Sequence, residues 1–292
     1  MKRKIIITGI SSAIMQKLCL LIDLSEYQVT GITRYPGSTS LDNIEIIKGD
    51  LRNIHEFAYN FKGCYMVIHG AAVTHSRNEK EYYQVNLDAT KSLVEIAKDH
   101  GVKRFIYVST NTAGTKSGAY GFTKFLAEEY IQENFNGWTI LRLSEVYGGS
   151  IREGIERLIV NVIEKPCVLC PVGIPSKFYP IHIDDTAQLM HSRIFKGDYQ
   201  NKISVINGPD GFSFLEIIEL TKNISGRKVK VQFLNRKLML LIKFFARILP
   251  LNLGMAPDQV DRLYSIKHFE KPEGSLMKME TYIANLIKAK NK

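Results

Sequence analysis

The chain has 292 residues, 45% of them apolar, which suits one α/β core with a small additional lobe. Its net charge of +10 comes from scattered basic residues, and no RNA-reading motif or helix-turn-helix accompanies them, so we expect no nucleic-acid partner. No apolar run reaches the roughly 18 residues of a membrane-spanning helix. Met1-Lys-Arg-Lys leads straight into a predicted strand, so we expect no signal peptide and a cytoplasmic location.

The first half of the chain alternates short buried strands with helical stretches. Strands are predicted over residues 4–8, 27–33, 44–48, 65–69 and 104–109, and a helix over 79–100 ends at Gly101. This alternation predicts an α/β fold with a doubly wound parallel sheet. Ligands of such sheets bind at the carboxyl ends of the strands. The residues that fall there are Gly9, Arg34, Asp50, Ala71 and Thr110.

One further motif carries chemistry. In Tyr120-Gly-Phe-Thr-Lys124 a phenol and an ammonium are one helical turn apart, on the same face. A nearby cation favours phenolate, so we expect Lys124 to lower the pKa of Tyr120. Thr110 follows a predicted strand and can hydrogen-bond the same substrate oxygen. The three side chains suit proton transfer at an alcohol or ketone oxygen while a hydride moves at the carbon.

Taken together, the motifs resemble an extended short-chain dehydrogenase/reductase of the NAD(P)-dependent epimerase/dehydratase family. The resemblance runs from Lys4 to about Ala187. Its motifs are Thr8-Gly9, Gly49-Asp50-Leu51, His69-Gly-Ala-Ala72, Val85-Asn86, Val108-Ser-Thr110, Tyr120-x-x-x-Lys124, Leu141-Arg142 with Val146-Tyr-Gly148, and Ile181-His-Ile-Asp-Asp-Thr-Ala187. It implies a Rossmann domain over 1–165, to which 178–210 return, and a smaller C-terminal substrate-binding lobe mainly over 166–292. It implies that substrate specificity lies in about 150–172 and 212–292.

The resemblance also implies roles for individual residues. The catalytic set is Thr110, Tyr120 and Lys124. The cofactor-binding set is Gly9, Ser11, Ser12, Ala13, Ile14, Arg34, Asp50, Leu51, Ala71, Ala72 and Lys124, which reaches the nicotinamide ribose. The substrate-binding set is Thr74, Asn86 and Lys177. No metal site is expected. His182 is expected to be a structural residue of its motif.

Two departures from the family pattern concern the cofactor loop and the Leu-Arg-Pro segment. The loop reads Thr8-Gly9-Ile-Ser-Ser12-Ala-Ile-Met15, so serine and methionine stand where the family has its second and third glycines. This predicts weaker dinucleotide binding or a shifted loop. The other departure is Leu143-Ser144 after Arg142, without the proline. Arg34, where an acidic residue would bind a ribose diol, favours NADP over the alternative, NAD.

The expected activity is therefore NAD(P)-dependent oxidoreduction at C4 of a nucleotide-diphosphate sugar. We expect a 4-ketoreductase in surface-polysaccharide precursor synthesis, acting as a homodimer. A UDP-hexose or UDP-N-acetylhexosamine 4-epimerase is the alternative, because its first half-reaction uses the same residues. A non-catalytic scaffold or sensor that binds a dinucleotide is the second alternative, favoured by Ser12 and Met15. Asn111-Thr112 replaces the acidic pair of dehydratases and disfavours 4,6-dehydration.

Two segments outside the motifs leave alternatives open. Residues 235–249 form a basic amphipathic pattern that packs on the substrate lobe or, alternatively, makes a peripheral membrane contact. Cys167-Val-Leu-Cys170 has the spacing of a redox pair. It stands between two prolines without a thioredoxin-like context, so we expect reduced thiols.

Overall fold

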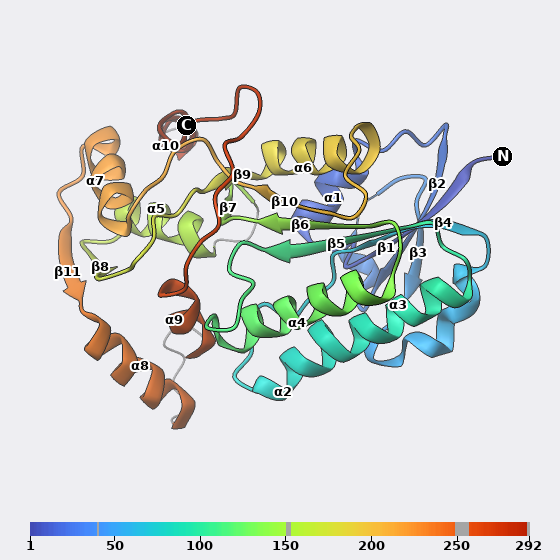
Figure 1. Ribbon diagram of the computed structural model, residues 1–292. Coiled ribbons are helices and arrows are strands. Elements are labelled where there is room, and N and C mark those ends of the chain that lie inside the picture. Colours follow the sequence, from blue (N-terminus) through green and yellow to red (C-terminus); the bar gives the residue numbers. More distant parts are fainter. Residues whose placement is uncertain (40, 150–152, 249–256, 291–292) are drawn as a thin grey trace.

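Seven parallel strands form the central sheet of the protein, which is a computed structural model describing residues 1–39, 41–149, 153–248 and 257–290 (Figure 1). Residues 150–152 of the predicted segment 150–172 lie outside the described residues, as does residue 249 of the predicted segment 235–249. The strand order across the sheet is β10 (Lys202–Ile206), β6 (Trp138–Leu143), β5 (Arg104–Thr110), β4 (Cys64–His69), β1 (Arg3–Thr8), β2 (Tyr27–Thr33) and β3 (Glu45–Lys48). The expected doubly wound α/β sheet is thus confirmed.

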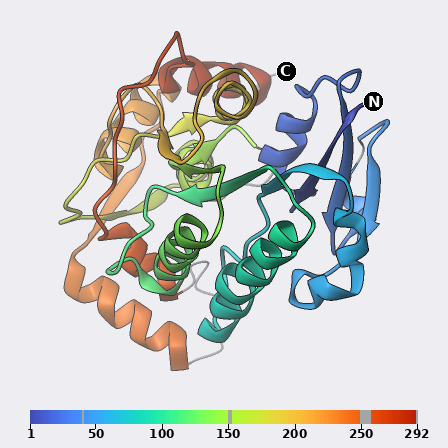
Figure 2. The same ribbon diagram turned by 45° about the vertical axis from the view of Figure 1, so that its right-hand side comes forward.

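Helices cover both faces of the sheet because its strands are apolar on both sides (Figures 1 and 2). In β1, Ile6 faces one core and Ile5 and Ile7 face the other, as the two-residue period of a strand requires. One face carries α3 (Ala89–Asp99), α4 (Gly118–Asn134) and the 3₁₀ segment Leu51–Phe61. The other carries α1 (Ala13–Cys19) and α6 (Ile183–His191).

The helix expected over 79–100 is interrupted. It begins as α2 (Glu79–Tyr82), passes through the π-helical segment Tyr83–Asp88 and continues as α3. A π segment inserts an extra residue into the helical turn and is frequent at functional sites. Here it contains Asn86, which is buried.

A third apolar core lies beyond the carboxyl end of the sheet. It is built from α5 (Gly154–Glu164), α7 (Phe214–Ser225), α10 (Met279–Lys290) and the strand pair β8 (Cys167–Pro171) with β11 (Lys230–Leu234). The short pair β7 (Val146–Tyr147) and β9 (Ile181–His182) connects it to the sheet. Helix α5, which the predicted boundary at residue 165 assigns to the first domain, packs in this third core.

A buried ion pair fixes α4 to the sheet. The guanidinium of Arg142 on β6 contacts the carboxylate of Glu128 with Nε at 3.1 Å from both oxygens, and Ser109 of β5 donates to the same carboxylate. Strand pairing places Ser109 opposite Arg142. Because Glu128 lies one turn after Lys124, this contact sets which face of α4 turns toward the carboxyl end of β5.

Candidate functional site

The loops after β1 and β4 touch at the carboxyl edge of the sheet. Gly9 has a φ of +70°, and a Cβ there would lie 2.6 Å from Cα of Ala71. Glycine is therefore required at position 9 both by backbone conformation and by space. The amide of Ala71 donates to Oγ1 of Thr8 at 3.3 Å, and Ala71 and Ala72 are half-buried beside the turn. The resulting backbone cradle is where the family resemblance puts the cofactor pyrophosphate.

The structure explains both unusual residues of the loop. Ser12 is the N-cap of α1, and its Oγ accepts a hydrogen bond from the amide of Met15 at 3.3 Å. Met15 is buried against Gly70, where a Cβ would lie 2.7 Å from its sulfur. Methionine therefore stands where the family has its third glycine, and the room for its side chain comes from Gly70 on the neighbouring loop. Ser11 accepts from Thr33 at 3.1 Å, and Ala13 and Ile14 open α1 half-buried.

Three more candidate cofactor residues, Arg34 after β2 and Asp50 and Leu51 after β3, differ in their exposure and contacts. Arg34 is exposed, with its guanidinium carbon 5.5 Å from the ring centroid of Tyr35. Asp50 caps the 3₁₀ segment and binds Arg52, whose Nε lies 3.1 Å from Oδ1. This hydrogen bond is the main reason that the pKa of Asp50 is lowered. Leu51 is buried.

A buried chain of hydrogen bonds links these loops to α3. Thr90 donates to the carbonyl oxygen of Asn86 at 2.9 Å, so Nε2 of His69, 2.8 Å away, is the donor to Thr90. Nδ1 of His69 then accepts from Thr8 at 2.6 Å. Both ends of the Asn86 amide bond the main chain of Val73. Asn86, expected to bind substrate, thus uses its amide to hold the loop after β4.

Thr110 is the last residue of β5, and Tyr120 and Lys124 lie one turn apart in the first half of α4. Thr110 is half-buried, and its Oγ1 lies 3.1 Å from that of Thr112, whereas the neighbouring Ser109 is buried on Glu128. Lys124 is buried, donates from Nζ to the carbonyl of Val108 at 2.7 Å, and lies 3.9 Å from the ring centroid of Tyr107. Thr110 rather than Ser109 therefore presents a hydroxyl toward the edge of the sheet.

The charges around Tyr120 differ from the sequence expectation. Burial raises the pKa of the Tyr120 phenol above its ordinary value, and the charges that act on it are Arg262, which lowers that pKa, and Asp258, which raises it. The Arg262 guanidinium carbon lies 4.5 Å from the Tyr120 ring centroid. The prediction that Lys124 would hold this pKa down is wrong for this structure, because the ammonium bonds Val108 instead. Burial lowers the pKa of Lys124 itself to about 7.

Arg262 and Asp258 were missed as site residues. They lie on α9 (Pro257–Leu263), which belongs to the C-terminal part of the chain and packs at the start of α4 (Figure 1). The sequence analysis assigns no site residue to Gln259-Val-Asp-Arg-Leu263. Nothing in its spacing indicates a contact with a tyrosine some 140 residues earlier.

The predicted substrate-binding residues outside this cluster are exposed. Thr74 lies in the loop after β4, and its carbonyl accepts from Arg262 at 2.8 Å, which brings it to the site. Lys177 pairs with Glu216 at 3.0 Å on α7, so its ammonium already has an anionic partner. His182 is the N-cap of α6, accepting from the amide of Asp184 at 3.3 Å.

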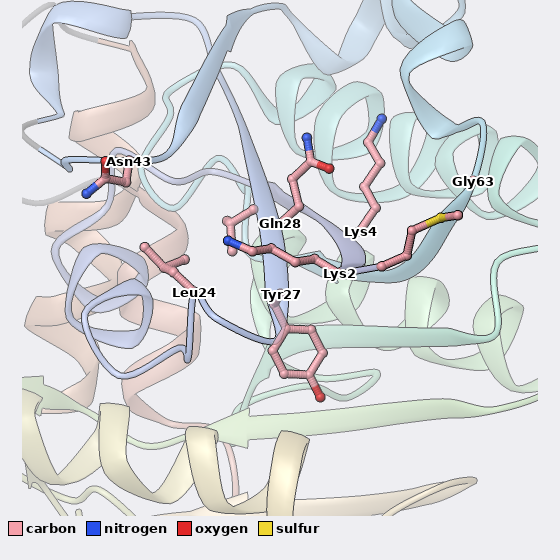
Figure 3. Close-up of a pocket in the computed structure, with 9 residues that line it drawn as sticks. Lys2, Lys4, Leu24, Tyr27, Gln28, Asn43 and Gly63 are labelled. Carbon is pink, nitrogen blue, oxygen red and sulfur yellow. The ribbon is translucent and has the colours of Figure 1, made fainter.

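One hollow lies away from this edge. It has a volume of about 670 Å³ and is lined by residues at the amino ends of β1 and β2, among them Lys4, Tyr27 and Gln28. Tyr27 and Gln28 extend to opposite sides of their strand and do not converge on one point (Figure 3). The hollow is therefore at the wrong end of the sheet for the ligand of a doubly wound fold.

The amphipathic segment forms α8 (Arg236–Ile248). It buries Met239 and Ala246, and Lys243 bonds Asp261 of α9 at 2.6 Å. Its apolar residues Leu240, Leu241, Phe244 and Phe245 remain exposed. Within the described residues, no helix is long and apolar enough to cross a membrane. The two thiols of β8 are free, and their three-residue spacing sends them to opposite sides of the strand.

Comparison with known proteins gives a consistent picture. The sequence model of the NAD dependent epimerase/dehydratase family matches residues 5–203. A Bacillus subtilis protein named "Uncharacterized UDP-glucose epimerase YtcB" is 27% identical over 79% of this chain and 84% of its own length. The mitochondrial 40 kDa subunit of NADH-ubiquinone oxidoreductase from Neurospora crassa is 22% identical over 62% of this chain and 47% of its own length.

Among solved structures, the fold is that of a UDP-glucuronic acid 4-epimerase from Bacillus cereus in complex with NAD. The TM-score is 0.68, the sequence identity is 22%, and the match covers 98% of both chains.

The buried imidazole of His69 predicts a pH dependence of stability. Burial lowers its pKa from 6.5 to about 3, so below about pH 6.5 the unfolded chain binds a proton that the folded chain does not. The contribution of neutral His69 to the free energy of unfolding is complete above about pH 6.5 and is lost as the pH falls below it. Between about pH 7.5 and pH 5 the loss reaches about 2 kcal/mol.

The measurement is urea unfolding of wild type, His69→Gln and, as control, His55→Gln, which changes an exposed histidine. Wild type and the control are expected to lose about 2 kcal/mol more than His69→Gln over this interval. Equal losses in all three proteins would show that His69 is not held neutral.

Proposed function

Because the chain belongs to the NAD dependent epimerase/dehydratase family, we propose that it oxidises or reduces C4 of a nucleotide-diphosphate sugar. The observation that carries the proposal is the placement of Thr110 at the end of β5 and of Tyr120 and Lys124 one turn apart on α4, in a doubly wound parallel sheet. Their hydroxyl, phenol and ammonium match the chemistry of an alcohol–ketone interconversion. The UDP-glucose epimerase relative, which aligns over most of its length, supports a UDP-sugar as substrate.

Each residue has a distinct proposed task. Tyr120 exchanges a proton with the C4 oxygen, and Thr110 hydrogen-bonds that oxygen and fixes its direction. Lys124, with a pKa near 7 and a position beneath the site, binds the nicotinamide ribose. The nicotinamide, when bound, takes up or supplies the hydride at C4. We further propose that the lobe around α5, α7 and α10 binds the nucleotide, with Thr74 and Lys177 at its entrance.

The edge of the sheet fits a dinucleotide. The pyrophosphate would lie against the backbone amides of the loop after β1, beside the close Gly9–Ala71 contact, where Gly9 carries no side chain that could cover these amides. Ser11, Ser12, Ala13 and Ile14 would surround that pyrophosphate. Asp50 and Leu51 would line the adenine site, and Ala71 and Ala72 the path to the nicotinamide. Arg34, exposed at the end of β2, favours the 2′-phosphate of NADP.

Two net reactions use this machinery, and we propose 4-epimerisation as the first. The named epimerase relative favours it, and the compensation of Met15 by Gly70 removes one reason to expect loose cofactor binding. The 4-ketoreductase expected from the sequence is the second candidate, favoured by Arg34 because NADPH is the cellular reductant. The relationship to a respiratory-complex subunit suggests the scaffold alternative, but the complete Thr110, Tyr120 and Lys124 set favours catalysis.

Tyr120→Phe is expected to lower turnover by roughly 10²–10⁴ because the proton carrier is lost, while cofactor binding persists. Turnover and dinucleotide affinity are measured side by side. Tyr130→Phe is the matched control, since Tyr130 lies on the same helix with its hydroxyl on Glu95, away from the site. Normal turnover in Tyr120→Phe would remove this tyrosine from the mechanism.

Arg34→Ala is expected to weaken NADPH binding at least about tenfold and to change NADH binding little, since only NADPH carries the 2′-phosphate. Fluorescence titration of both cofactors measures the two affinities. An equal loss for both would indicate that Arg34 stacks on the adenine and does not select NADP.

The net reaction is decided by stoichiometry. With UDP-glucose or UDP-N-acetylglucosamine, an epimerase produces the galacto epimer without net consumption of NAD(P)H, and this is the expected result. Mass-balanced chromatography of the sugars and absorbance of the added cofactor measure both quantities. Consumption of one NADPH per UDP-4-keto-6-deoxy sugar, without epimerisation, would instead establish the ketoreductase.

A further inference from the structure

The start of α4 is capped by a residue far along the chain. Ser117, at the N-cap position, makes no capping hydrogen bond within the described residues, and the first turn holds no acidic side chain. Instead Oδ1 of Asp258 accepts from the amide of Tyr120 at 3.0 Å. Asp258 is 5% exposed, and Gly118, with φ of +67°, leaves the space for its carboxylate. A helix N-terminus favours a carboxylate. This contact therefore holds the first turn of α4 through the amide of Tyr120.

Arg262 completes the arrangement from the next turn of α9. Its Nε lies 2.8 Å from Oδ2 of Asp258, its guanidinium covers the ring of Tyr120, and it donates to the carbonyl of Thr74. Gln259 contacts His75 at 2.7 Å in the same loop. Three contacts therefore tie α9 to the loop after β4 and to α4 at once. Lys267 holds the far end of α9 by donating to the carbonyl of Arg262 at 2.7 Å.

We propose that Asp258 and Arg262 are a positioning pair for Tyr120, in which the carboxylate fixes the tyrosine's backbone and the guanidinium lies over its ring as the facing cation. The proposal rests on the proton-transfer role proposed above for Tyr120. It divides between two residues what the sequence assigned to Lys124: the lysine serves the ribose, and Arg262 serves the phenol. The substrate lobe thereby contributes directly to the proton carrier.

The electrostatic surroundings of Tyr120 support the pair. A guanidinium over an aromatic ring is attracted to it, and the attraction grows when the ring carries the charge of a phenolate. Asp258 opposes this effect, so the pair acts through the nearer guanidinium. The other titratable groups that face Tyr120 or the pair come from α2, the loop after β4, β5, α4 and the segment after α9. Among the described residues they are Tyr82, His75, Tyr107, Lys267 and Lys124, which lies one turn along α4, together with Asp261 of α9, whose charge acts on Asp258.

The first test is the pH profile of kcat/KM. Arg262→Gln is expected to move the limb that reports Tyr120 to higher pH by about one unit or more, because an opposite charge within 4–6 Å has been removed. Arg262→Lys is expected to return the limb most of the way. Arg3→Gln is the matched control, since its guanidinium lies over the ring of Tyr65, 5.0 Å from the centroid, at the amino ends of β1 and β4 and so at the opposite end of the sheet from Thr110.

A merely structural role predicts something else. If Arg262→Gln lowers Tm or turnover while the limb stays in place, the proposal is overturned. Asp258→Asn provides a second variant of nearly equal volume: it removes the opposing charge, so its limb is expected to move to lower pH, opposite to that of Arg262→Gln. Movement of both limbs in the same direction would also overturn the proposal.

The last measurement does not depend on catalysis. The ring-carbon NMR signal of Tyr120, assigned by its absence in Tyr120→Phe, is titrated in wild type, Arg262→Gln and Arg262→Lys. A higher titration midpoint in Arg262→Gln alone supports the pair even if no sugar nucleotide is turned over. An unchanged midpoint overturns it even if the enzyme is active, so the two proposals fail separately.

Discussion

The contact between the loops after β1 and β4 is the constraint on which the rest of the site depends. Gly9 and Ala71 approach so closely that no side chain fits between them, and the Thr8–His69–Thr90 hydrogen bonds lock the strands beneath. This contact fixes the start of α1 and the loop that Asn86 supports. Because β4 pairs with both β1 and β5, the same contact also fixes the position of the loop after β1 relative to the end of β5, where α4 follows.

Buried charge is concentrated on α4, and each charge has a partner on another element. Glu128 binds Arg142 and Ser109 of the sheet, Lys124 binds the main chain of β5, and the first turn receives Asp258. Charges out of water are tolerated only when paired or hydrogen-bonded. The pairs therefore orient α4 from both its sheet side and its N-terminal end, which places Tyr120 against Arg262 of α9.

The unusual cofactor loop shows how one departure from a family pattern is balanced by another residue. Met15 fills the space of a missing glycine because Gly70, in the loop after β4, carries no side chain. The hydroxyl of Ser12 caps the N-terminus of α1, a helix of seven residues. The loop keeps its backbone amides and its turn at Gly9, which are the parts that hold a phosphate. Loss of glycines from the motif therefore does not by itself indicate loss of the site.

The sequence by itself determined the parallel sheet, the strand ends with Thr110 at one of them, and the one-turn spacing of Tyr120 and Lys124 on a helix. Apolar periodicity and one-turn spacing are local properties of the chain. It could not determine the π segment at Asn86, the Gly70–Met15 contact or the partner of Tyr120. Those depend on which elements meet in space. The cation over Tyr120 comes from Arg262 because α9 packs on α4, while burial turns Lys124 toward Val108. Only tertiary packing decides such contacts, since it joins residues that no local pattern relates.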